Sequence, residues 1–142
     1  MTFENSEFFK LKHFKLEKPF GNFYFFETFF ISEVNEGVHF DWNMIQEVMD
    51  YIVEFYGITA KLGYISNRIN SYSTNPHTWN KVKNKYNIII AGAIISYTKT
   101  TFLNASLEKE LSKTKIKRCL SLKEAIEWIL DLNEFKKEEI HF

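Results

Sequence analysis

The sequence predicts an α/β fold in which an N-terminal antiparallel β-hairpin precedes strands and helices that alternate to the end of the chain. Two observations support this prediction. Residues 88–95 form an unbroken apolar run, IIIAGAII, and such runs are typical of parallel strands that are buried on both faces. After residue 41, segments with helical periodicity alternate with short apolar segments, an order that requires parallel strands and right-handed crossovers. We therefore expect a small mixed, mostly parallel sheet with about four helices.

The N-terminal part of the chain supplies the predicted hairpin. Residues 8–16 alternate imperfectly between apolar and basic side chains, as an edge strand does. Pro19 and Gly21 then mark a turn. Residues 23–31 are predicted to form the second strand, because aromatic side chains occupy both of its alternating faces. Residues 1–6 are expected to be loose. The aromatic side chains on both faces of the second strand predict self-association, with a two-fold dimer as the expected form.

Helix signals follow in four places. Asp41 is a suitable N-cap for the first helix, and Gly57 stands where a glycine would end it. Pro76 suits the first position of a short second helix, with Asn75 as its cap. A capping box over residues 121–124 begins the last helix. The third helix, residues 101–111, is expected to bury Phe102, Leu103, Leu107 and Leu111.

Three further segments are expected to be parallel strands: residues 60–66, 88–95 and 115–120. The middle one should lie at the centre of the sheet, because an apolar run of this kind needs cover on both faces. Gly92 within it indicates a close approach by a neighbouring helix or by backbone.

Length and composition limit the possible classes of protein. The 142 residues fit one domain, with a core at about residues 8–132 and a charged tail at 133–142. The formal net charge is zero, so no overall field attracts nucleic acid. The longest apolar run is too short to span a bilayer. The single cysteine, Cys119, cannot form an internal disulfide, which suits a reducing compartment. We therefore expect a cytoplasmic protein that neither binds nucleic acid nor spans a membrane.

The sequence contains no complete catalytic or metal-binding motif. Its four histidines are scattered, and one cysteine does not complete a ligand set. No serine lies in a nucleophile motif. We therefore expect no enzyme activity and no cofactor. Glu27, inside the aromatic segment, is either a buried acid with a raised pKa or a residue that faces solvent.

The most polar stretch follows the strand at residues 60–66 and leads towards a helix, where open α/β sheets usually bind ligands. The loop 66–74 is therefore the predicted functional surface, with Arg68 as its anchor. Two accounts of Arg68 remain open: it binds an anionic group with two hydrogen bonds, or it pins the loop to backbone carbonyls. The candidate site residues are Ser66, Asn67, Arg68, Asn70, Ser71, Tyr72 and Ser73.

Three segments also carry a family resemblance: YISNR at residues 64–68 with Tyr72, Ser73 and Pro76 behind it, IIS at 94–96, and SLKEAIEW at 121–128. With the order of elements, they resemble the STAS domain of bacterial anti-sigma-factor antagonists. The likeness is closest to the STAS/SEC14-like proteins of flavobacteria and their relatives. Phosphorylatable STAS proteins carry an Asp-Ser-Ser-Gly-like signature, whereas residues 70–74 here read NSYST, without the Asp and the Gly.

The resemblance implies a non-enzymatic regulatory or protein-interaction module, whose partner is another protein or a second copy of the chain. The alternative is a small-molecule or apolar-ligand binding domain that uses the loop 66–74. The SEC14 part of the resemblance suggests an apolar ligand.

Overall fold

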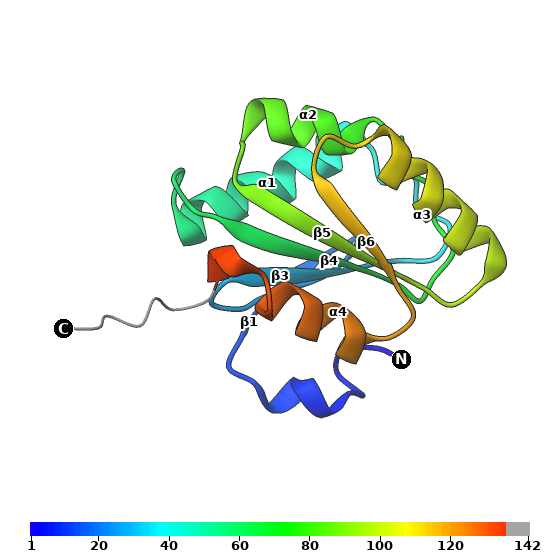
Figure 1. Ribbon diagram of the computed structural model, residues 1–142, viewed down its shortest axis with the longest axis horizontal. Coiled ribbons are helices and arrows are strands. Elements are labelled where there is room, and N and C mark those ends of the chain that lie inside the picture. Colours follow the sequence, from blue (N-terminus) through cyan, green and yellow to red (C-terminus); the bar gives the residue numbers. More distant parts are fainter. Residues whose placement is uncertain (136–142) are drawn as a thin grey trace.

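The computed structural model describes residues 1–135 and shows a six-stranded sheet whose strands lie side by side in sequence order (Figure 1). The first three strands pair antiparallel with one another, and the third to sixth pair parallel with one another. The strands are β1 Phe14–Lys18, β2 Gly21–Phe25, β3 Phe29–Val34, β4 Leu62–Arg68, β5 Ile89–Ser96 and β6 Lys115–Cys119.

Helices cover both faces of the sheet (Figure 1). The helices α1 (Trp42–Tyr56), α2 (Thr78–Lys85) and α3 (Lys99–Leu111) pack on one face. The helix α4 (Leu122–Leu130) and the N-terminal segment pack on the other. Two short 3-10 helices, Glu7–Lys10 and Asn133–Phe135, complete the described elements. The predicted fold class, a mixed and mostly parallel sheet with four helices, is confirmed.

The apolar run at residues 88–95 forms the parallel strand between β4 and β6, as the sequence predicts. Local signals for the starts of the first and last helices also hold, whereas α3 begins at Lys99, two residues before its predicted start. The carboxylate of Asp41 accepts a hydrogen bond of 2.9 Å from the N–H of Met44, and Ser121 caps α4 in the same way. Gly57 follows α1 with a φ of 95°. The helix α2, by contrast, begins two residues later than predicted, at Thr78.

The predicted antiparallel hairpin is present as β1 and β2, which pair across a turn at Pro19 and Phe20. Its extent was predicted wrongly, because a third strand follows and the N-terminal part is a three-stranded antiparallel meander. Residues 23–31 make two strands, β2 and β3, that turn at residues 26–28. The aromatic pattern conceals this turn, since its first residue, Phe26, is aromatic and stacks on Phe29 with the ring centroids 4.5 Å apart. Glu27 lies at the tip and is exposed, so the solvent-facing account of this residue is correct. Only the end of the predicted first strand is extended, since Glu7–Lys10 is a 3-10 helix.

The expectation that residues 1–6 are loose is also wrong. Phe3 is fully buried against Tyr24 and Phe26. Its N–H donates a hydrogen bond of 2.8 Å to the carboxylate of Glu33, which also accepts one of 2.7 Å from the Asn67 side chain. Burial raises the pKa of Glu33 above its ordinary value, although both hydrogen bonds oppose the shift. A buried acid therefore holds the N-terminal segment against the sheet.

The helix α3 turns a different face to the core from the one that its leucines suggest. Leu103 is 57% exposed and Leu107 is 48% exposed, whereas Ala105 and Glu108 are buried. Glu108 forms an ion pair with Arg68 of β4, and this contact needs the helix face that carries Glu108. The predicted burial of Leu103 and Leu107 is therefore wrong, because a polar contact decides the rotation of the helix; Phe102 and Leu111, also predicted to face inward, are half-buried.

Gly92 lies under the indole ring of Trp79, so the predicted close approach is by a helix side chain. A Cβ atom added at Gly92 would meet two ring carbons of Trp79 at 2.4 and 2.5 Å. We predict that Gly92→Ala lowers the free energy of unfolding by about 1–3 kcal/mol, because overpacking forces the ring to move. Urea denaturation followed by circular dichroism measures this loss.

The matched control is the same substitution in a Trp79→Phe background, where the smaller ring leaves room for the new methyl group. There, Gly92→Ala should cost clearly less than in the wild type. An equal cost in both backgrounds would contradict the steric explanation.

Candidate functional site

The predicted site begins on a strand rather than in a loop. Because β4 extends to Arg68, three of the predicted residues are strand residues, and all three are buried: Ser66, Asn67 and Arg68. Successive strand residues point to opposite faces of a sheet. Ser66 and Arg68 accordingly contact the layer of α1, α2 and α3, whereas Asn67 bonds to Glu33 and the N-terminal segment. The structure thus divides the predicted set between the two faces.

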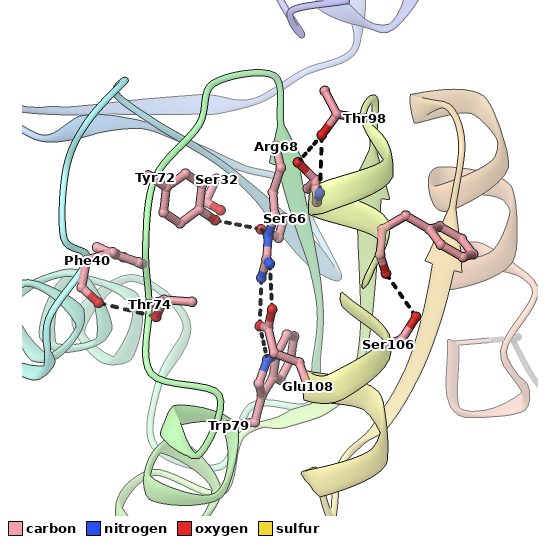
Figure 2. A network of polar contacts seen from close by, with 12 residues as sticks. Ser32, Phe40, Ser66, Arg68, Tyr72, Thr74, Trp79, Thr98, Ser106 and Glu108 are labelled. Atoms are coloured by element: carbon pink, nitrogen blue, oxygen red, sulfur yellow. Dashed lines mark hydrogen bonds and ion pairs between the residues drawn. The ribbon is translucent and has the colours of Figure 1, made fainter. Parts of the chain in front are cut away.

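The guanidinium of Arg68 is bound to a carboxylate that the sequence analysis missed. Its Nη1 and Nη2 atoms donate to the two carboxylate oxygens of Glu108, at 2.5 and 2.7 Å, and its Nε donates to Ser66 at 3.0 Å (Figure 2). The indole N–H of Trp79 donates to the same carboxylate at 2.9 Å. Side chains from β4, α2 and α3 therefore meet in one buried polar network. Arg68 neither reaches out to solvent nor pins the loop to carbonyls.

The network keeps Arg68 charged in spite of its burial. Desolvation acts to lower the pKa of a buried guanidinium. Tyr72 and the carboxylate of Glu108 act in the opposite direction and leave the pKa of Arg68 above its ordinary value. The Tyr72 ring centroid lies 5.6 Å from the guanidinium carbon, and the Tyr72 hydroxyl hydrogen-bonds to Ser66 at 3.0 Å. Tyr72 thus joins this network from the loop.

The loop after β4, residues 69–75, is attached to residues 37–40. Three main-chain hydrogen bonds of 2.8 to 3.0 Å join the two segments. The Ser73 hydroxyl lies 2.7 Å from Nδ1 of His39. The Asn70 side chain donates to the main chain at the end of β3 at 3.0 Å. These polar groups close the loop on its own chain, while the side chain of Ser71 is exposed.

An apolar pocket lies between α1, α2 and the sheet, with the loop 69–75 at one side. Its cavity volume is about 60 Å³. Arg68, Tyr72 and the polar network form part of its wall. Aliphatic side chains of α1 and α2 form another part, and the aromatic lining comes from Phe23, Phe30, Phe40, Tyr64, Tyr72 and Trp79. Asn67, Asn70, Ser71 and Ser73 do not line it.

Sequence reasoning missed two members of the Arg68 network: Glu108, which binds the guanidinium, and Trp79, which donates to Glu108. Glu108 lies among leucines on an otherwise ordinary charged helix, 40 residues from Arg68. A buried arginine on a strand requires a counter-charge, but the sequence offers no local signal for which acid supplies it.

The remaining candidates for chemistry are weak within residues 1–135. No three His, Cys, Asp or Glu side chains there lie close enough to hold a metal ion. Burial raises the pKa of the Cys119 thiol to about 12, so this cysteine is a poor nucleophile. No helix in this part of the chain is both long and apolar enough to cross a bilayer.

Comparison with known proteins gives a result for the fold. No family model matches the sequence, and no curated protein matches it. Among solved structures, the chain is similar to an uncharacterised protein of the DUF3478 family from Shewanella loihica PV-4, which has a SpoIIAA-like fold. The TM-score is 0.51 and the identity is 12%, over 83% of this chain and 92% of the other. The chain therefore has the STAS-like, SpoIIAA-like fold that the sequence predicts.

Proposed function

We propose that the protein is a non-enzymatic binding module that takes up a small, mainly apolar ligand in the pocket between α1, α2 and the sheet. The pocket is the observation that supports this proposal. Ligand sites are typically concave and apolar, with a few polar groups that orient the ligand. This pocket combines aromatic walls with the Arg68–Glu108 pair and the Tyr72 side chain. Of the two functions that the sequence leaves open, the geometry thus gives more support to the binding of a small-molecule or apolar ligand than to a regulatory role.

The size of the pocket limits the ligand and requires a movement. A cavity of about 150 Å³ holds benzene, whereas this one measures about 60 Å³. A ligand with one ring therefore fits only if a wall moves outward. The loop 69–75 is the wall best placed to do so, because Tyr72, Thr74 and Asn75 line the pocket, while Ser71, Ser73 and Asn75 are exposed to solvent. We propose this loop as the entrance.

The prediction for this function uses toluene, an apolar molecule with one ring, as the probe. In the wild type, toluene should shift the amide NMR signals of residues that line the pocket. Thr74→Phe should weaken binding at least tenfold, because Thr74 lines the pocket beside the entrance and the new ring occupies the ligand's space. The control is Thr100→Phe, which adds the same ring at an exposed position of α3 outside the pocket.

Toluene binding should be the same in Thr100→Phe and in the wild type. If the wild type does not bind toluene, or if Thr74→Phe binds it as tightly, the pocket is not a ligand site.

The second candidate is the regulatory or protein-interaction role that the STAS resemblance implies, in a cytoplasmic protein. The surface that first suggested a dimer is covered, since the aromatic side chains of β2 and β3 are buried by the chain itself. A different surface, on α3, favours dimer formation. Leu103 and Leu107 lie one turn apart on α3, and both are exposed to solvent. We propose a second copy of the chain as the partner of this helix face.

The dimer prediction is tested by light scattering at high micromolar concentration. The wild type should have the mass of a dimer, and Leu103→Ser combined with Leu107→Ser should have the mass of a monomer, because the apolar contact is lost. Leu120→Ser combined with Leu130→Ser removes two leucines that are at least as exposed and lie elsewhere, and this variant should remain a dimer. A monomeric wild type would contradict the prediction.

A further inference from the structure

We infer that the pocket selects an uncharged aromatic compound with one small polar group, such as a hydroxyl or an amide, at its outer end. This inference rests on the proposed function and adds the chemical class of the ligand. It depends on three features of the pocket: the state of its charges, the nature of its walls and the position of its free polar groups.

The charges in the wall of the pocket are already paired. Among the described residues that line it, the charged ones are Arg68 and Glu108. Their side chains are 8% and 4% exposed, and both carboxylate oxygens accept from the guanidinium fork. The Nε of Arg68 also donates a hydrogen bond to Ser66, and Glu108 also accepts one from the indole N–H of Trp79. The donor fork of Arg68 and both carboxylate oxygens of Glu108 are therefore occupied, so neither side chain can pair with a charged ligand in this arrangement.

A charged ligand would therefore lose its hydration without gaining a counter-charge. An anion would have to displace Glu108 from Arg68 and leave that carboxylate buried without its partner, which is strongly unfavourable. A cation would have to displace Arg68 from Glu108, which would leave the guanidinium buried without its partner. A neutral ligand leaves the pair intact and avoids the cost of burying an unpaired charge.

The walls favour a flat ring. The side chains of Phe30, Tyr64 and Trp79 lie side by side, since the Phe30 and Tyr64 rings are stacked with centroids 4.7 Å apart, and Tyr64 and Trp79 are 5.4 Å apart. Phe40 and Tyr72 meet edge to face at 6.3 Å near the loop. Aromatic pairs gain stability from such stacked and edge-to-face arrangements. An aromatic ligand can continue this packing, which a flexible aliphatic chain cannot do as well.

The lining holds both bonded and free polar groups. The hydroxyls of Tyr64 and Tyr72 are bonded to Ser32 and Ser66. By contrast, the Asn75 amide nitrogen and the Thr78 hydroxyl have no hydrogen-bond partner within residues 1–135. Asn75 is exposed, and Thr78 is partly exposed. A ligand hydroxyl or amide next to these two groups would bond to them while its ring stays in the apolar interior.

The test compares four probes that share one ring: toluene, benzyl alcohol, benzoate and benzylamine. We expect benzyl alcohol to bind to the wild type at least as tightly as toluene. Benzoate and benzylamine should bind at least tenfold more weakly than benzyl alcohol, because each brings a charge without a partner. NMR titration at neutral pH and fixed salt gives all four dissociation constants on the same amide signals.

The outcomes separate this inference from the proposed function. If toluene does not bind, the ligand pocket itself is refuted. If toluene binds and benzoate or benzylamine binds as tightly as benzyl alcohol, the pocket stands and the inference about charge is wrong.

Two variants test the residues named. Thr78→Val removes the hydroxyl at nearly constant volume. It should weaken the binding of benzyl alcohol about threefold or more and leave the dissociation constant of toluene unchanged. The control Thr100→Val should change neither. Glu108→Gln removes the counter-charge of Arg68. The affinity for benzoate should therefore rise at least fivefold relative to the affinity for benzyl alcohol. An unchanged ratio in Glu108→Gln, or equal effects of Thr78→Val on both probes, would overturn the assignment.

Discussion

The ion pair between Arg68 and Glu108 organises one face of this molecule. Both side chains are buried, so both charges have lost their hydration, and a pair of this kind is stable only with close geometry and additional hydrogen bonds. The structure provides these: a two-pronged contact between the side chains, and further bonds to Ser66 and Trp79. Because the acid sits on α3, the arginine on β4 and the indole on α2, the pair defines how two helices lie on the sheet.

The same pair explains the character of the pocket beside it. A lone arginine in an apolar pocket would attract anions, but the carboxylate cancels its charge and occupies its donor fork. The wall is therefore polar without a net charge. The indole of Trp79, fixed by its bond to Glu108, forms the adjacent wall and lies directly over Gly92. The arrangement of the pocket thus follows from contacts that also hold the fold together.

What could be predicted from the sequence was local. The strand β5 is apolar up to its last residue, Ser96, and the caps Asp41 and Ser121 bond to amides three residues away, so neighbouring residues suffice to recognise them. The site could not be predicted in the same way. Its acid lies 40 residues from its arginine, on a helix whose leucines suggested another inner face. The turn between β2 and β3 was hidden by aromatic residues on both sides of it. The predicted tail beyond residue 135 lies outside the described residues.

The most direct test of this account is a double-mutant cycle on the ion pair, measured by urea denaturation. Arg68→Met and Glu108→Leu should each lower the free energy of unfolding by about 3–5 kcal/mol, because each leaves a buried charge without its partner. The double variant, which removes both charges, should be more stable than either single variant. Additive losses in the double variant would contradict the claim that the two side chains act as one buried pair.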